Sequence, residues 1–213
     1  YDFGAGPVPA HPHPNGGGWV AETASVAATA YVGPHAQVFG DARVFGDARV
    51  SGAAQVLGDA RVSGAALVFG AARVFGDARV LGAARVSGAA WVLGDARVFG
   101  DARVTGAAWV LGDARVSGDA RVLGDAQVLG DAQVLGDAQV SVLPAVLRSD
   151  GYTVVAYPTA TQGVRLTAGC RDFSFDEART HWHATRGGTP LGDESLAIVD
   201  YLEAFARRAG WLA

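Results

Sequence analysis

The chain has 213 residues and a formal net charge of −4, and all 17 of its basic residues are arginine. A protein that binds nucleic acid through phosphates needs a basic stripe, so this charge predicts no nucleic-acid partner. No apolar run approaches the ~18 residues that span a bilayer, and no leader segment opens the sequence, so we expect no membrane partner.

Residues 1–18 are rich in proline and glycine and have no periodicity. We interpret them as an N-terminal arm or cap. His11 and His13 lie two residues apart, so an extended chain would direct both side chains the same way. Because no further ligands lie nearby in the sequence, a solvated tail is a simpler interpretation of this pair than a metal site.

A six-residue repeat fills the next stretch of the chain. Valine occupies every sixth position from Val20 to Val140, and an alanine stands four residues after each valine from Ala24 to Ala138. An α-helix does not fit this period, because it would rotate successive valines by about 240° around its axis. In a short strand the alanine and the valine both point inward, and glycine can form the corner between strands. Three strands and three corners then close a coil of eighteen residues.

The unit from Val44 to Arg49, Val-Phe-Gly-Asp-Ala-Arg, resembles the hexapeptide-repeat family. The unlooped repeats and the Gly-Gly-Gly-Trp-Val opening at 16–20 look closest to repeat proteins of bacteria and phages. The resemblance implies a left-handed parallel β-helix; the usual chirality rule alone would predict the opposite hand. We predict an all-β solenoid of about seven three-sided coils over residues 19–143.

A period of eighteen sorts the outward residues onto three sides, which differ. The second and third sides are lined mainly by arginines, with aspartates at the corners that we expect to neutralise them. The first side is an apolar strip on the order of 400 Å², which is at or above what a soluble monomer leaves bare. Identical chains, the C-terminal domain or a foreign partner could cover it, and we favour a homo-oligomer, a trimer above all. The predicted interface residues are Phe39, Leu57, Phe75, Trp91, Leu93, Trp109, Leu111 and Leu129.

After Val140 the repeat stops, and residues 144–213 predict a small α+β domain of ββαα order. Alternating patterns over 152–157 and 164–170 predict a hairpin. Ser174 opens a capping box and a helix that runs to about Thr185. A second helix is expected over 194–209, beginning at Gly192 or Asp193. We expect this domain to cap the last coil, to oligomerise or to contact a protein partner.

The resemblance also implies an alternative function. Acyltransferases of the hexapeptide-repeat class act on CoA or acyl-carrier thioesters, use a histidine base near a subunit interface, and usually carry a loop that interrupts the coils. Here no loop interrupts the coils, and His35 is the sole catalytic candidate in the repeat. His181 and His183 would point about 200° apart on a helix, so they predict no metal site.

We therefore predict no cofactor and no metal. The preferred function is a non-catalytic structural scaffold or interaction module, phage-associated, with a cytoplasmic or virion-associated location. The first side is where we expect contact with other molecules, and the arginine-lined sides keep the protein dissolved.

Overall fold

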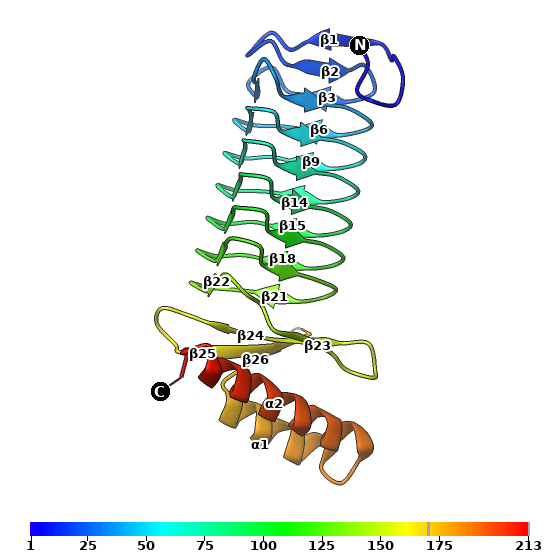
Figure 1. The fold of residues 1–213 in the computed structure, drawn as a ribbon. Coiled ribbons are helices and arrows are strands. Elements are labelled where there is room, and N and C mark those ends of the chain that lie inside the picture. The colour runs from blue at the N-terminus through cyan, green and yellow to red at the C-terminus, as the bar shows by residue number, and fades with distance from the viewer. Residues whose placement is uncertain (170, 213) are drawn as a thin grey trace.

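The repeated alanine and valine side chains form the core of a solenoid. Every repeat alanine and valine from Ala30 to Val140 is at most 2% exposed. The computed structural model describes residues 1–169 and 171–212. It shows a stack of coils followed by a small sheet and two helices (Figure 1). The predicted parallel β-solenoid is confirmed.

Three sheets form the three sides of the solenoid, and all their strand pairs are parallel except the pair of β1 with β2. The first side contains β1 (Ala10–Pro12), β2 (Trp19–Ala21), β5 (Gln37–Val38), β8 (Gln55–Val56), β11 (Arg73–Val74), β14 (Trp91–Val92), β17 (Trp109–Val110) and β20 (Gln127–Val128). The second side contains β3 (Ser25–Val26), β6 (Arg43–Val44), β9 (Arg61–Val62), β12 (Arg79–Val80), β15 (Arg97–Val98), β18 (Arg115–Val116) and β21 (Gln133–Val134). The third side contains β4 (Tyr31–Val32), β7 (Arg49–Val50), β10 (Leu67–Val68), β13 (Arg85–Val86), β16 (Arg103–Val104), β19 (Arg121–Val122) and β22 (Gln139–Val140).

Glycine is required at the corners because successive coils stack closely there. Gly40 has a φ of +68°, a conformation that other residues rarely adopt. A Cβ atom at Gly40 would lie only 2.8 Å from the backbone nitrogen of Gly58 in the next coil. The corner glycines from Gly40 to Gly118 are therefore fixed both by backbone conformation and by the space between coils.

The N-terminal arm adds an antiparallel strand, β1, to the edge of the first side. His11 is exposed and its Nδ1 lies 2.9 Å from Glu22 Oε1, whereas His13 is buried with its Nδ1 3.2 Å from the Asn15 carbonyl oxygen. The expectation that both histidines face the same way is wrong, because β1 ends at Pro12 and the chain turns there.

The C-terminal sheet has four antiparallel strands, β23 (Ala145–Leu147), β24 (Thr153–Pro158), β25 (Val164–Ala168) and β26 (Arg171–Phe173). β24 and β25 form the predicted hairpin, although the last predicted strand residue, Cys170, lies outside the described residues. The two outer strands were not predicted from the sequence, because three residues are too few to show an alternating pattern.

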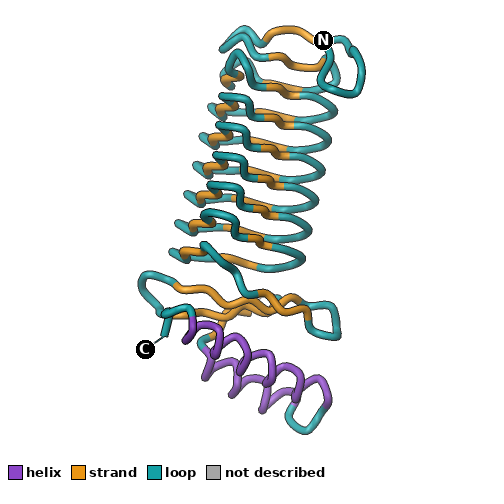
Figure 2. The backbone as a smooth tube through the Cα atoms, viewed as in Figure 1, coloured by secondary structure: helices purple, strands orange, loops and turns teal. Residues whose placement is uncertain are grey.

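This sheet is packed between the solenoid and the helices, as Figure 2 shows. Val155 and Tyr157 extend the solenoid core, whereas Val154 and Ala156 pack with the helices. The Thr153 backbone N–H donates a hydrogen bond of 2.8 Å to Asp131 Oδ1 at the end of the solenoid. The sheet thus covers the end of the solenoid and leaves its sides open.

The helices are α1 (Phe175–Arg186) and α2 (Pro190–Arg208). The capping box at Ser174 is confirmed. The start predicted for the second helix is too late, because Thr189 is the N-cap and Pro190 occupies the first turn, where its missing N–H is tolerated. Among the described residues, neither helix combines the length and apolar character that a bilayer span requires.

Candidate interaction surface

Strand register places the outward side chains of the first side in columns along the solenoid. Trp91 on β14 pairs with Trp109 on β17, and their rings stack at 5.2 Å between centroids with an interplanar angle of 3°. Phe75 meets Trp91 edge-on at 5.9 Å, and the Arg73 guanidinium lies 5.3 Å from the Trp91 ring centroid. The result is a continuous aromatic surface over three coils, with Trp109 40% exposed at its end.

The N-terminal arm already covers one end of this side. Tyr1 stacks on Trp19 at 4.4 Å, and Phe3 stacks on Phe39 at 4.7 Å. Gln37 Nε2 donates a hydrogen bond of 3.0 Å to the Tyr1 hydroxyl. At this end of the first side, the aromatic rings of the arm therefore lie flat on those of the solenoid.

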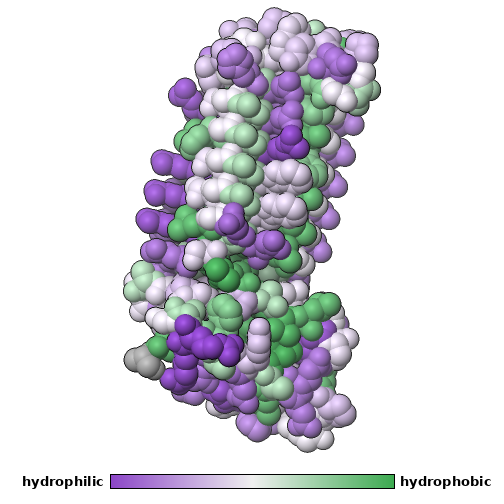
Figure 3. All heavy atoms as spheres, in the orientation of Figure 1, coloured by the Kyte–Doolittle hydropathy of each residue, from purple (hydrophilic) through white to green (hydrophobic). Residues whose placement is uncertain are grey.

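The structure brings the eight predicted interface residues together on the first side. Seven of them are half-buried by the coils above and below, and Trp109 is exposed. Exposed aromatic side chains are not confined to this side, since Phe45 and Phe99 lie on the second side and Phe69 lies on the third. The distinctive property of the first side is its continuous apolar column from Phe39 to Leu129. Figure 3 shows one face of the molecule, on which hydrophobic spheres run along the solenoid and hydrophilic side chains project beside them.

The other two sides carry arginine ladders. On the second side Arg79 pairs with Arg97, and Arg97 with Arg115, in direct register. Throughout residues 19–143, all of which the structure describes, no ion pair joins a corner aspartate to a ladder arginine. The expected neutralisation therefore does not occur through direct contacts, and the ladders stay solvated columns of like charge.

The candidate histidines lie apart from one another. His35 is exposed at the corner before β5. His181 is half-buried and stacks on Phe173 at 5.1 Å, while His183 is exposed. Burial, with the charges of Arg171 and Arg186, lowers the pKa of His181. No cluster of three or more potential metal ligands occurs in the described part of the chain.

One group of side chains was not anticipated from the sequence. Arg148, Arg171 and Arg186 surround a cavity between the C-terminal sheet and α1. They are distant from one another in the sequence and belong to no motif. The only indication was the His181-Trp182-His183 cluster, two residues of which line the same cavity.

Comparison with protein families identifies the repeat. A family described as YdcK Beta solenoid repeat matches residues 36–52, 42–58, 72–88, 96–112 and 114–130. The chain carries β-solenoid repeats. No curated protein matches it. A solved structure of a candidate acetyltransferase from Bacillus cereus is similar over 85% of this chain and 91% of that one, at 9% identity and a TM-score of 0.39. A likeness this low assigns no activity to the chain.

Proposed function

We propose that the protein is a non-catalytic, rigid interaction module that self-associates through the first side of its solenoid, as a trimer with parallel axes. The proposal rests on the stacked pair of Trp91 and Trp109, of which Trp109 is 40% exposed. Tryptophan is enriched among the residues that dominate protein interfaces. A bacterial or phage assembly that needs a stiff spacer would suit such a module.

Burial of the tryptophan pair would supply a useful part of the association energy. Covering the exposed 40% of Trp109 removes on the order of 100 Å² of mostly apolar surface from water. At about 25 cal/mol per Å², this contributes about 2–3 kcal/mol for each protomer. The other apolar residues of the column add to it, and the rigid backbone loses little conformational freedom on association.

Charge distribution favours the first side as a surface for a second copy of the chain. Packing the second side against itself would bring arginine ladders together, which is unfavourable. The column centred on Trp91 contains one arginine, Arg73, and is otherwise uncharged. It can therefore be buried against other copies of the chain without desolvating a row of like charges.

The two edges of the first side favour parallel axes. One edge carries a column of corner aspartates, and the other carries mainly corner alanines. The aspartates are Asp41, Asp59, Asp77, Asp95, Asp113 and Asp131, and the alanines are Ala53, Ala71, Ala89 and Ala107. A rotation axis parallel to the solenoid brings the aspartate edge of one protomer to the alanine edge of the next. An antiparallel arrangement would place aspartates against aspartates.

The test compares two substitutions of equally exposed aromatic residues. Trp109→Ser removes the exposed ring of the first side, and Phe99→Ser removes a ring that is 37% exposed on the second side. Light scattering coupled to size exclusion should show an oligomer for the unmodified chain and for Phe99→Ser, and a monomer for Trp109→Ser. Equal effects of the two substitutions would contradict the proposal, and circular dichroism checks that both variants are folded.

The acyltransferase alternative depends on the resemblance and on His35. Acyl transfer to an acceptor that is detectable with acetyl-CoA, and that is lost in His35→Ala, would replace the scaffold proposal. His35→Ala is a mild change for the fold, because the side chain is exposed.

A further inference from the structure

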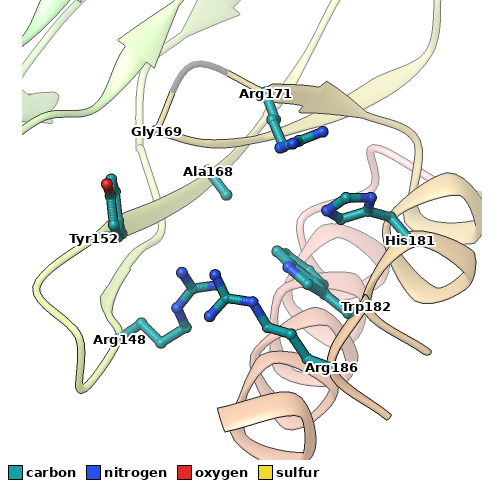
Figure 4. Close-up of a pocket in the computed structure, with 8 residues that line it drawn as sticks. All are labelled: Arg148, Tyr152, Ala168, Gly169, Arg171, His181, Trp182 and Arg186. Atoms are coloured by element: carbon teal, nitrogen blue, oxygen red, sulfur yellow. The ribbon is translucent and has the colours of Figure 1, made fainter. Parts of the chain in front are cut away.

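A cavity of about 160 Å³ lies between the C-terminal sheet and α1, away from the sides of the solenoid. Figure 4 shows the residues that line it. They come from the segment after β23, from the ends of β24, β25 and β26, and from α1. The lining residues are Arg148, Tyr152, Ala168, Gly169, Arg171, His181, Trp182 and Arg186.

Positive charge exceeds negative charge around this cavity. Arg148 is only 4% exposed, and its guanidinium donates hydrogen bonds of 2.8 Å and 2.7 Å to the two carboxylate oxygens of Asp150. Arg186 approaches the same carboxylate at 3.5 Å. The Arg171 side chain forms no hydrogen bond or ion pair with another described residue. The Asp150 carboxylate therefore contacts two of the three guanidinium groups, and that of Arg171 has no carboxylate partner among the described residues.

The guanidinium groups lie on opposite sides of the cavity (Figure 4). In Figure 4, those of Arg148 and Arg186 lie together on one side, and that of Arg171 lies on the other beside His181. Arg148 is fixed further by a hydrogen bond of 3.2 Å from Nη1 to Ser195 Oγ. An anion placed between these groups would relieve the repulsion among them, and arginine matches carboxylate and phosphate oxygens in pairs.

The cavity also has an aromatic wall. The Arg148 guanidinium carbon lies 5.9 Å from the Trp182 ring centroid and 5.7 Å from that of Tyr152. The volume is close to that of a protein cavity of about 150 Å³ that accepts one benzene molecule. There is room for an anionic group with a ring-sized body.

We propose that this cavity binds a small organic oxyanion, with its charged group between the arginines and its carbon body against Trp182. A carboxylate and a phosphate monoester present the same chemistry to the guanidinium groups. The site is separate from the first side, so it stands independently of the proposed self-association.

The test uses phenyl phosphate, benzoate and inorganic phosphate as probes, with isothermal titration calorimetry at low ionic strength. We expect both organic probes to bind, and phenyl phosphate to bind more tightly than inorganic phosphate. Arg171→Gln and Arg186→Gln should each weaken binding at least about tenfold, since each removes a charged hydrogen-bond donor. Arg208→Gln, at an exposed position at the end of α2, removes the same charge outside the cavity and should leave binding unchanged.

Three results would overturn the proposal. The first is that none of the probes binds. The second is that Arg208→Gln weakens binding as much as Arg171→Gln, which would show a general effect of charge. The third is equal affinity for phenyl phosphate and inorganic phosphate, which would remove the role assigned to Trp182. Melting curves of the variants confirm that the fold is intact in each comparison.

Discussion

Each position of the hexad is constrained by a different physical requirement. Alanine and valine are fixed by burial along the axis, and the corner glycine is fixed by a positive φ and by the coil stacked on it. The outward positions face solvent and can vary without disturbing either requirement. Differences in chemistry among the three sides are therefore carried by residues such as Trp91 and Arg97.

Two glycines separate the backbone requirement from the stacking requirement. Gly88 and Gly136 both have a positive φ, of +73° and +65°. A Cβ atom at Gly88 would lie 2.6 Å from the Gly106 carbonyl oxygen. A Cβ atom at Gly136 would have no atom within 4 Å. Gly136→Ala should cost about 1–2 kcal/mol from backbone strain alone. Gly88→Ala should lower the free energy of unfolding, measured by urea denaturation, clearly more than Gly136→Ala does. Equal costs would show that stacking does not fix the glycine.

The ion pair between Arg148 and Asp150 is the most buried in the C-terminal domain. Hydrogen bonds from the Arg148 guanidinium lower the pKa of Asp150 to about 2 from an ordinary value of 3.8. The carboxylate therefore stabilises the folded state at pH values above about 4. This contribution decreases as the pH falls through the folded pKa near 2.

Asp150→Asn should lower the free energy of unfolding by about 2–4 kcal/mol at pH 7, because it leaves the Arg148 charge buried without its partner. Urea denaturation at pH 7 and at pH 2 measures this cost, which should be smaller at the lower pH. Asp176→Asn is the control, since that side chain is 99% exposed. A pH-independent difference between the wild type and Asp150→Asn would contradict the assigned pKa.

At the scale of elements, β24 is the junction of the molecule. Its apolar run has both faces buried, because alternate residues pack on the solenoid and on the helices. The sequence pattern of 152–157, interpreted as alternating, predicted a strand. It did not indicate what would pack on each face, because that depends on contacts between distant parts of the chain.

Alternate residues of β24 should have separable effects on local stability. Val154→Ala and Val155→Ala remove the same atoms from equally buried positions. Hydrogen exchange should increase in α1 and α2 for Val154→Ala, and in β21 and β22 for Val155→Ala, because each cavity lies on one face of the sheet. Identical exchange patterns for the two variants would show that the sheet does not separate two layers.

For the whole molecule, periodicity made the fold predictable and left the cavity undetected. A valine at every sixth position specifies the coil, the three sides and therefore the column that contains Trp91 and Trp109. The arginines of the C-terminal cavity follow no period. A sheet edge and a helix bring them together, so only the tertiary structure reveals them.

The ends of the solenoid are covered by the chain itself. The arm covers one end of the first side through Tyr1 and Phe3, and the C-terminal sheet covers the last coil. The remaining length of the first side carries the exposed Trp109. We propose that the chain self-associates through this length, and the mass of the particle in solution tests this.

Sedimentation equilibrium of the unmodified chain at micromolar concentration is the most direct measurement. We expect a particle of three times the 21.7 kDa chain mass, which dissociates when Trp109 is replaced by serine. A particle of 21.7 kDa at every concentration, with Trp109 accessible to a fluorescence quencher, would contradict it.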